Sequence, residues 1–422
     1  MNEITRSETN VAAKSSGAFY EHLEAYVREQ AQGMIQRILE EEVEESLGRV
    51  KSQRRTDDVP AGYRNGHGRE RRLSTSIGTI TVRRPRVRET EDRFVSRVLP
   101  MFKRRTQEIG EALPKLYLHG LALGDFELAL RGLLGDGAPL SSSSIARLRL
   151  GWQTEYDEWR HRPLGKTLVA YLWVDGIYVK AGLEKDKAAL LVAIAGLADG
   201  RKEVIAIEAG ARESETAWSF VLRSLRERGL HCPRLVIGDG ALGIWSALDN
   251  VYPDAGQQRC WNHRMRNVLD CVGNKKQPQA KQLLTKVMYA PTEQAAVNAK
   301  DAFQRWANEQ QCAKAAERID QDWDRMVAYY SYPQEHWVHL RTTNIIESPF
   351  ATVRLRTAAA KRYKKVEGAT AMIWKLLKVA QQTFRKLNAP DLLIKVCAKA
   401  PFKDGVQVEE NVSQPREYKQ AA

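Results

Sequence analysis

Hydrophobic residues recur at helical spacing through the first part of the chain. From residue 19 to residue 47 they repeat every three or four positions and stop before Gly48, which predicts one long amphipathic helix. From 73 to 82 apolar and polar residues alternate around Gly78, which predicts a small β-hairpin. Residues 106–159 show short helical segments separated by glycines, with serines that can cap a last helix beginning near Ser143. This order resembles a helix-turn-helix, and a plain helical linker is the alternative.

The centre of the chain changes to the rhythm of a β-sheet. Its first strand-like segment is apolar on both alternating faces, as expected for a strand covered on both sides. Seven segments are predicted, in order, as strand, strand, strand, helix, strand, helix and strand: 167–174, 188–195, 203–208, 214–228, 234–237, from 242, and 257–259. This order is that of a ribonuclease-H-like mixed sheet. Helical patterns at 280–289, 293–310 and 312–330 then predict an all-helical insertion.

Positive charge is concentrated in one stretch. The chain of 422 residues has a net charge of +14, and residues 49–105 hold 17 lysines and arginines against 6 acidic residues. Such a zone favours a polyanionic partner, with nucleic acid as the leading choice, and the alternatives are a solvated basic surface or a ribosomal or membrane-surface protein. The longest mostly apolar run, 188–198, is about half the roughly 20 residues that cross a bilayer, and no signal pattern opens the sequence. We therefore expect a cytoplasmic, DNA-binding protein with no membrane partner, and its five scattered cysteines fit a reducing compartment.

These patterns predict a multi-domain α/β protein. We expect a ribonuclease-H-like mixed β-sheet catalytic core with an all-helical insertion, preceded by a basic, mainly helical DNA-binding region. The expected regions are an amphipathic helix (1–48), a basic DNA-binding region with the hairpin and the helix-turn-helix candidate (49–159), the first part of the core (160–260), the insertion (261–340), the last part of the core (341–395) and a flexible tail (396–422).

Two aspartates follow apolar strands, each directly before a glycine. Asp175 ends the first central strand and Asp239 the fourth, and these strand ends are neighbours in the expected sheet. Either one alone is more simply a turn-forming Asp-Gly. Together they suit a divalent cation, because close carboxylates repel each other and Mg²⁺ or Mn²⁺ prefers oxygen ligands. The candidates for a third carboxylate are Glu335 and Glu347, and Asn344 with Glu347 could form a capping-box-like helix start.

Several motifs together resemble those of one family. They are Tyr63-Arg64-Asn65-Gly66, Asp175-Gly176-Ile177-Tyr178-Val179-Lys180, Asp239-Gly240, Gln258-Arg259-Cys260-Trp261-Asn262-His263 with Arg266-Asn267, and Arg341-Thr342-Thr343-Asn344 before Glu347. In this order, over residues 63–393, they resemble the bacterial Mutator-type insertion-sequence transposases, members of the D-D-E group with a ribonuclease-H-like core. One departure is that Ser348-Pro349-Phe350 follow the glutamate, where the family usually has an arginine.

The resemblance implies a catalytic centre and a reaction. Asp175, Asp239 and Glu347 would be the catalytic carboxylates and the ligands of two Mg²⁺ or Mn²⁺ ions. The enzyme would bind the ends of its insertion sequence, cleave phosphodiester bonds and join the 3′-OH ends to target DNA. Because two ends must be processed together, we expect a homodimer or a larger homo-oligomer. The alternatives are a non-enzymatic DNA-binding regulator, which leaves the carboxylates unexplained, and another ribonuclease-H-like nuclease such as a junction resolvase.

Further residues are expected to contact DNA or to support the catalytic centre. The basic tract 83–88 contains a proline and is expected to lie as an extended arm along phosphates. The expected DNA contacts are Arg83, Arg84, Arg86, Arg88, Ser143, Arg341, Asn344, Arg354 and Arg356. Cys260 and His263, three positions apart, could form half of a zinc site with Cys232 or Cys271 near them in space. We favour a supporting role over zinc because no second pair has zinc-finger spacing.

Overall fold

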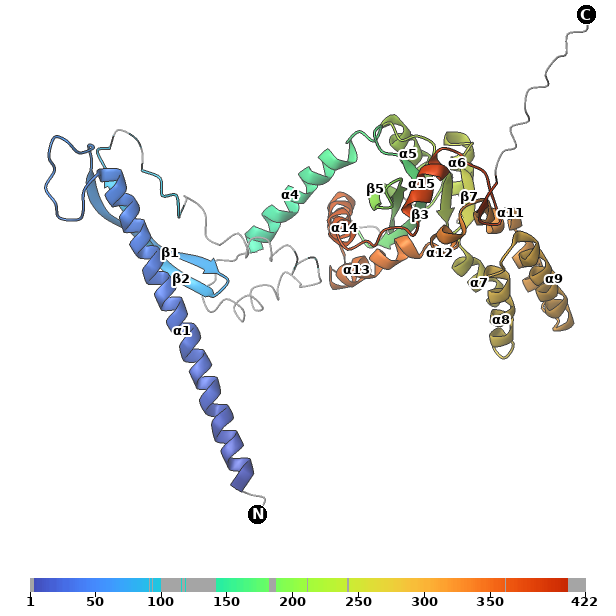
Figure 1. Cartoon of the computed structure of the whole chain (residues 1–422), viewed down its shortest axis with the longest axis horizontal. Helices are drawn as coiled ribbons and strands as arrows, with labels where there is room; N and C mark the ends of the chain where they lie inside the picture. Colours follow the sequence, from blue (N-terminus) through green and yellow to red (C-terminus); the bar gives the residue numbers. More distant parts are fainter. Residues whose placement is uncertain are drawn as a thin grey trace, which may run out of the picture. The chain divides into compact units, whose positions relative to one another are not determined.

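The computed structural model describes residues 4–408 apart from residues 91, 93, 100–114, 116–117, 119–141, 182–186, 211, 241–242 and 361. The chain divides into two compact units, Met1–Leu148 and Arg149–Ala422 (Figure 1). Most of the region expected to form a helix-turn-helix lies outside the described residues, as does the side chain of Ser143. Its last helix is described as α4 (Ser142–Arg160). None of the described helices has the length and apolar character needed to cross a membrane.

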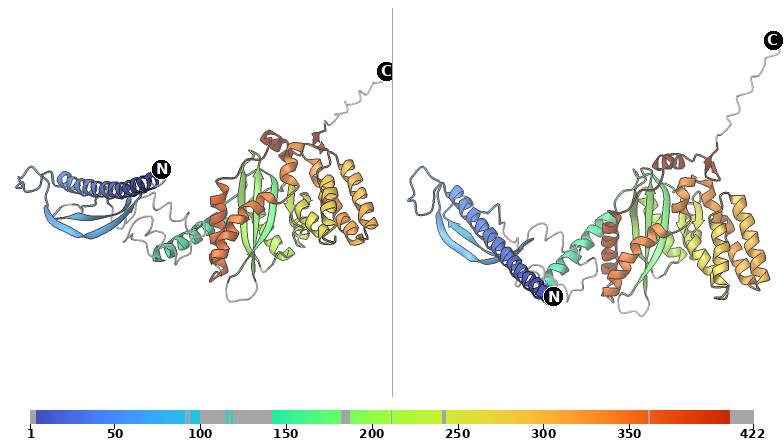
Figure 2. Two further views of the ribbon diagram at one scale, coloured as in Figure 1. Left: turned by 90° about the horizontal axis from the view of Figure 1, so that it is seen from below. Right: turned by 60° about the horizontal axis from the view of Figure 1, so that its bottom comes forward.

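The first unit consists of one long helix lying along a hairpin (Figure 2). Helix α1 (Ile4–Leu47) begins earlier than predicted and ends, as predicted, before Gly48, whose φ of 61° is left-handed. Strands β1 (Tyr63–Thr75) and β2 (Gly78–Arg88) are longer than the predicted hairpin. A small hydrophobic core joins helix and hairpin: Leu39, Leu73, Ile80, Val82 and Leu99.

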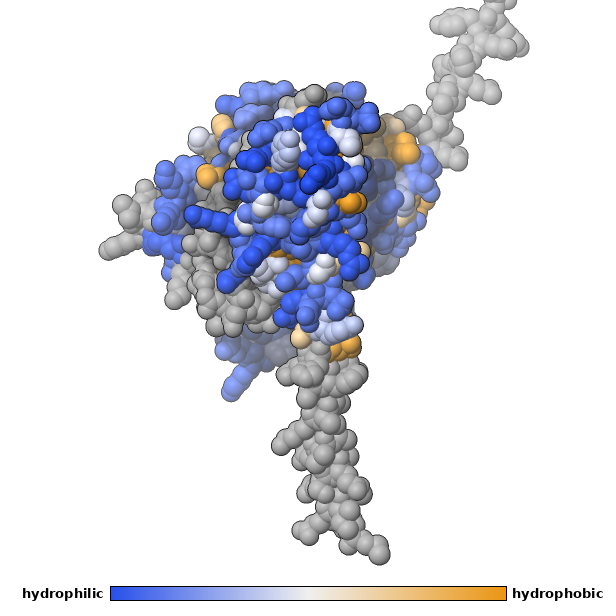
Figure 3. Space-filling model, turned by 90° about the vertical axis from the view of Figure 1, so that its left-hand side faces the viewer, coloured by the Kyte–Doolittle hydropathy of each residue, from blue (hydrophilic) through white to orange (hydrophobic). Residues whose placement is uncertain are grey.

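The basic tract 83–88 is extended, as predicted, but it is paired with β1 as part of the hairpin and is not a separate arm. Strand β2 continues through Pro85, and Arg88 pairs with Tyr63 at the far end of β1. Proline is tolerated because the register shifts on both sides of His67, which is opposite Pro85. Arg83, Arg86 and Arg88 are exposed on this strand. The described residues that face the viewer in Figure 3 are mainly hydrophilic.

The second unit is built on the mixed five-stranded sheet that the sequence predicts. Its strands are β3 (Val169–Val179), β4 (Ala188–Leu197), β5 (Lys202–Gly210), β6 (Leu235–Gly238) and β7 (Gly256–Arg259). They lie in the order β5-β4-β3-β6-β7. Neighbours among β3, β4 and β5 are antiparallel, whereas β6 is parallel to both β3 and β7.

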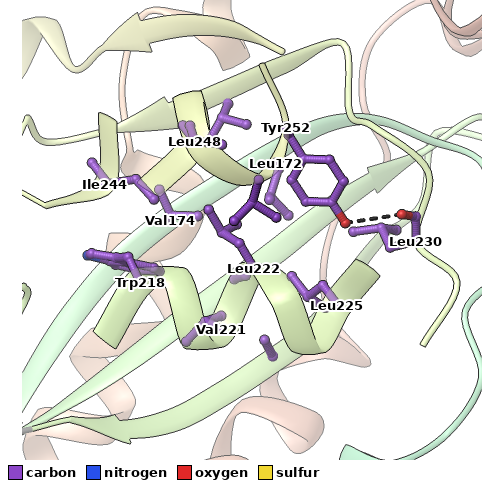
Figure 4. Packing of buried hydrophobic residues seen from close by; sticks show 14 of the residues in the cluster. Leu172, Val174, Trp218, Val221, Leu222, Leu225, Leu230, Ile244, Leu248 and Tyr252 are labelled. Atoms are coloured by element: carbon purple, nitrogen blue, oxygen red, sulfur yellow. Dashed lines mark hydrogen bonds between the residues drawn. The ribbon is translucent and has the colours of Figure 1, made fainter. Parts of the chain in front are cut away.

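Helices cover this sheet. Helices α5 (Glu215–Glu227) and α6 (Ile244–Val251) bury their apolar sides against it. The side chains at this contact, shown in Figure 4, include Leu172, Val174, Trp218, Leu222, Ile244 and Leu248. Each large side chain buried in this way stabilises the fold by about 2 kcal/mol. Helices α13 (Asn344–Ala360) and α14 (Val366–Gln381) contact β3, β4 and β5.

The insertion is helical, as predicted. It contains α7 (Trp261–Leu269), α8 (Gln277–Met288), α9 (Glu293–Glu309), α10 (Ala313–Asp320), α11 (Trp323–Val327) and α12 (Trp337–Leu340). The single helix predicted at 312–330 is wrong, because Asp322 adopts a left-handed conformation, with a φ of 54°, that separates α10 from α11.

The chain stays structured beyond the point where a flexible tail was expected. Helix α15 (Pro390–Cys397) is followed by the two short strands β8 (Phe402–Lys403) and β9 (Val406–Gln407). The backbone N–H of Gly405, between these strands, donates to the carbonyl of Tyr330 at 3.1 Å. Residues 409–422 lie outside the described part of the chain.

Candidate active site

Asp175 and Asp239 are placed side by side by the register of two parallel strands. Trp173 of β3 is opposite Ile237 of β6, so each aspartate lies two residues beyond this pair. Asp239 directly follows β6, as predicted. Asp175 lies inside β3, so the prediction that it ends the strand was wrong: the alternation continues to Val179.

A third carboxylate that the sequence analysis missed belongs to this pair. Oxygen atoms of Asp175, Asp239 and Glu213 all lie within 4.8 Å of one another. We call these three residues the aspartate cluster. Glu213 comes from the turn between β5 and α5, and it lies over Gly176, where a Cβ atom would be 2.3 Å from its Oε1. The glycine after Asp175 was the only signal for a close approach here, and an acid beside a helix N-terminus is ordinarily explained by the helix dipole.

The electrostatics of the aspartate cluster suit a cation. Burial, reinforced by the charges of Asp239 and Glu213, raises the pKa of Asp175 to about 7, while the N–H of Gly176 opposes this by donating to Oδ1 at 2.8 Å. Burial and the charge of Asp239 also raise the pKa of Glu213. Carboxylates in this arrangement repel each other when ionised, and a divalent cation with a preference for oxygen ligands removes that penalty. The donor set therefore fits Mg²⁺ or Mn²⁺.

Glu347 lies in a second group, on the first turn of α13. Ligand atoms of Glu347, Cys260 and His263 lie within 4.8 Å of one another, and we call these residues the glutamate cluster. Among the described residues, neither Cys232 nor Cys271 joins it. The predicted capping box of Asn344 and Glu347 is wrong, because the helix begins at Asn344, which makes Thr343 the residue before the helix and Ile346 its third residue.

Thr343, directly before α13, ties the glutamate cluster together. Its hydroxyl donates to Oε1 of Glu347, and its oxygen lies 3.2 Å from Sγ of Cys260. A hydroxyl has a single proton, so Thr343 donates to one of these two acceptors at a time, and Oε1 of Glu347 is the nearer. The backbone N–H of Thr343 also donates to Cys260 Sγ at 3.3 Å. One oxygen of Glu347 is thereby held by the protein.

His263 connects the two clusters. Its Nδ1 is 3.8 Å from Oε1 of Glu347. Contact with the Cys260 thiol, together with the negative charges of Glu347 and Asp239, raises the pKa of the imidazole to about 9, against the opposing effect of burial. The charge of His263 in turn lowers the pKa of Asp175. A protonated imidazole therefore lies between the acids of both clusters.

The other residues expected to contact DNA differ in their surroundings. The guanidinium of Arg341 lies 5.0 to 5.3 Å from the rings of Tyr289, Tyr329 and Trp337, so it is surrounded by aromatic side chains. Asn344 accepts a hydrogen bond of 2.9 Å from Asn262. On α13, Arg354 is exposed.

Arg356 and Arg84 have limited access to solvent. Arg356 is only 3% exposed, which makes it less suited to a DNA contact than Arg354. In the first unit, Arg84 is half-buried and donates to the carbonyl of Phe94 at 3.0 Å, whereas Arg83 is exposed and forms an ion pair with Glu70. These contacts separate arginines that hold the fold from arginines that face solvent.

Comparisons with known proteins identify the family of the chain. The family described as "Transposase, Mutator family" matches residues 3–386. The transposase for insertion sequence element IS6120 of Mycolicibacterium smegmatis is 44% identical over 71% of this chain and 93% of its own length. The transposase for IST2 of Acidithiobacillus ferrooxidans is 38% identical over 70% and 99%, and that for ISRM5 of Rhizobium meliloti is 26% identical over 86% and 89%. The chain therefore belongs to the Mutator family of transposases.

Proposed function

We propose that this transposase is a D-D-E enzyme that uses two divalent metal ions, with Asp175, Asp239 and Glu347 as their ligands. The observation that carries the proposal is the parallel register of β3 and β6, which sets Asp175 level with Asp239. Three antiparallel strands followed by two parallel ones are also the arrangement expected of a ribonuclease-H-like core. The charges of Glu347 and Asp239 both raise the pKa of His263, and this supports the assignment of Glu347 to the same centre.

The protein's own groups would hold and orient the reactants. Asp175 and Asp239 offer oxygens from fixed strand positions, and Glu347 offers the oxygen that Thr343 leaves free. Bound there, Mg²⁺ or Mn²⁺ would supply the Lewis acidity that activates a water or a 3′-OH and stabilises the leaving oxygen. No side chain of the enzyme has to become covalently attached to DNA in such a reaction.

DNA is the proposed substrate in both steps, first as the ends of the element and then as the target. The exposed Arg83, Arg86 and Arg88 of β2 offer phosphate contacts that carry no base specificity. We propose that the enzyme acts in the cytoplasm as a homodimer or a larger assembly, because two ends must be cut and joined in concert.

The test is to incubate the full chain with Mg²⁺, duplex DNA carrying the terminal sequences of its own element and a supercoiled target. Cleaved ends together with joined products are expected. Cleavage without joining would instead indicate a nuclease such as a resolvase, and binding without cleavage would indicate a regulator. Asp270→Asn, a change at an exposed aspartate outside both clusters, is the matched control for Asp175→Asn and should retain both products.

A further inference from the structure

A cavity of about 490 Å³ lies beside the aspartate cluster. Gly240, the residue after Asp239, forms part of its wall, and Trp245 of α6 forms another part. Three arginines from separate elements also line it: Arg259 at the end of β7, Arg318 of α10 and Arg325 of α11. We call this cavity the arginine pocket.

Positive charge exceeds negative charge around the arginine pocket. Asp322 is the shared counter-ion, bonded to Arg325 at 3.1 Å, to Arg264 at 3.0 Å and to Arg259. One carboxylate thus faces three guanidinium groups. Arg318 adds a fourth positive charge, and its side chain donates to the amide oxygen of Gln321 at 3.3 Å. A second lining carboxylate, Asp249, is bonded to the neutral Gln257 at 2.7 Å and leaves the surplus positive.

Two of the side chains that line the pocket also have a buried nitrogen without a hydrogen-bond partner. Within the described part of the chain, Nε of Arg259 and Nε1 of Trp245 are buried and have no acceptor. Arg259 reaches the peptide after Asp239 only because residue 240 is glycine: a Cβ there would be 2.3 Å from Nε of Arg259. Because these nitrogens have almost no exposed surface, they are not offered to the pocket, and it is the surplus of positive charge on its lining that favours an anionic ligand.

We propose that the arginine pocket binds one phosphate of the DNA strand next to the phosphodiester that is cut. This inference rests on the proposed function, because its ligand is the DNA of that reaction. Guanidinium groups match the geometry of phosphate oxygens and form charge-assisted hydrogen bonds with them. A phosphate held beside Gly240 would fix the position of the strand relative to Asp239. A free nucleotide carries the same phosphate chemistry, and the test below separates the two sources.

The test asks whether one arginine of the pocket interacts with one phosphate of the DNA. It compares the loss of DNA affinity when the arginine, the phosphate charge or both are removed. End DNA is synthesised with one neutral methylphosphonate at a time around the cut, and its Kd is measured with the full chain in Ca²⁺, so that no cleavage is needed. Wild type should show one position at which neutralisation weakens binding about tenfold, as for the loss of one hydrogen bond to a charged group. In Arg318→Ala the same neutralisation should have little further effect, since the partner is already gone.

Arg318 is the first choice because it is exposed and makes few contacts, and Arg325→Ala serves as a second variant whose folding is checked by Tm. The matched control is Arg305→Ala, at an exposed arginine of α9 outside the pocket, which should keep the whole tenfold penalty. The proposal is overturned if, at every position of the DNA, a methylphosphonate weakens binding as much in Arg318→Ala and in Arg325→Ala as it does in wild type.

Two further outcomes are distinguishable. In the first, AMP binds wild type but not Arg318→Ala, while each methylphosphonate weakens DNA binding equally in both proteins. This result would assign the pocket to free nucleotides and overturn the DNA assignment. Coupling between Arg318 and one phosphate in a protein that never cleaves DNA would support the pocket while the proposed catalytic function failed.

Discussion

The two clusters of the candidate active site are fixed by different kinds of interaction. In the aspartate cluster, backbone register sets Asp175 level with Asp239, because Asp175 lies in β3 and Asp239 directly follows the parallel neighbour β6. In the glutamate cluster, Glu347 stands on a helix and depends on side-chain contacts with Thr343 and His263. Strand register changes only if the sheet itself changes, whereas the position of the Glu347 carboxylate depends on the hydroxyl of Thr343. The aspartate cluster should therefore tolerate changes around it better than the glutamate cluster does.

The largest expected effect comes from removing a ligand charge in either cluster. Asp175→Asn, Asp239→Asn and Glu347→Gln should each lower the cleavage rate at least about a thousandfold, or ~4 kcal/mol, since shape is nearly kept and a metal ligand is lost. Cleavage of end DNA in Mg²⁺ measures the rate, and circular dichroism and DNA binding check the fold. Near wild-type cleavage by Glu347→Gln alone would leave the catalytic centre with the aspartate cluster only.

A smaller effect is expected when the support of Glu347 is removed without touching Glu347. Thr343→Val deletes the hydroxyl that donates to Oε1 and should weaken the activating metal about 10- to 100-fold, the range typical of residues that orient a metal ligand. Thr343→Ser keeps the hydroxyl and is the matched control. The Mn²⁺ concentration for half-maximal cleavage is measured for both. Equal Mn²⁺ dependence in Thr343→Val and wild type would show that Glu347 needs no such support.

How much of this site is visible in the sequence depends on the range of the interactions. Apolar runs and their order predict the strands, and Asp-Gly after two of them points to Asp175 and Asp239. The contact between Cys260 and Thr343 joins residues 83 positions apart, and no local pattern contains it. Glu213 has the same difficulty, because only the folded sheet brings it over Gly176.

The wrong expectations have local causes of the same kind. The sequence predicts strands that end at Asp175 and at Val82, whereas pairing with neighbouring strands carries both strands onward. At Asp322 the error is the opposite: the helical spacing predicts one continuous helix, whereas the left-handed backbone of Asp322 divides it in two. In the two strands, pairing with a neighbouring strand overrides the local preference.

A further prediction concerns Glu213, the one member of the aspartate cluster that comes from a loop. Its loop position is not set by strand register, so Glu213→Gln should weaken metal activation about tenfold at most, less than Asp175→Asn. The matched control is Glu227→Gln, at an exposed acid at the end of α5, the helix that follows Glu213. Both variants are compared in a Mg²⁺ titration of cleavage. A loss as large as that of Asp175→Asn would make Glu213 an equal ligand and replace the two-aspartate description.

The smallest expected effect is on stability, and it follows from the raised pKa of Asp175. A carboxyl with a folded-state pKa of about 7 and an ordinary value of 3.8 binds its proton more tightly in the folded protein, so stability falls as pH rises from about 4 to 7. The whole shift corresponds to about 4 kcal/mol, and partial exposure with the ionisation of neighbouring groups reduces this to about 1–2 kcal/mol.

In EDTA, the Tm of wild type should therefore drop by about 4 °C relative to Asp175→Asn between pH 4 and pH 7. Asp239 and Glu213 oppose ionisation, and His263 favours it. Mg²⁺ should abolish the difference, because a cation compensates the repelling carboxylates, and Glu227→Gln should follow wild type throughout. A Tm difference that is independent of pH, or that persists in saturating Mg²⁺, would mean that Asp175 does not experience the charge of its neighbours and that strand register alone does not make a metal site.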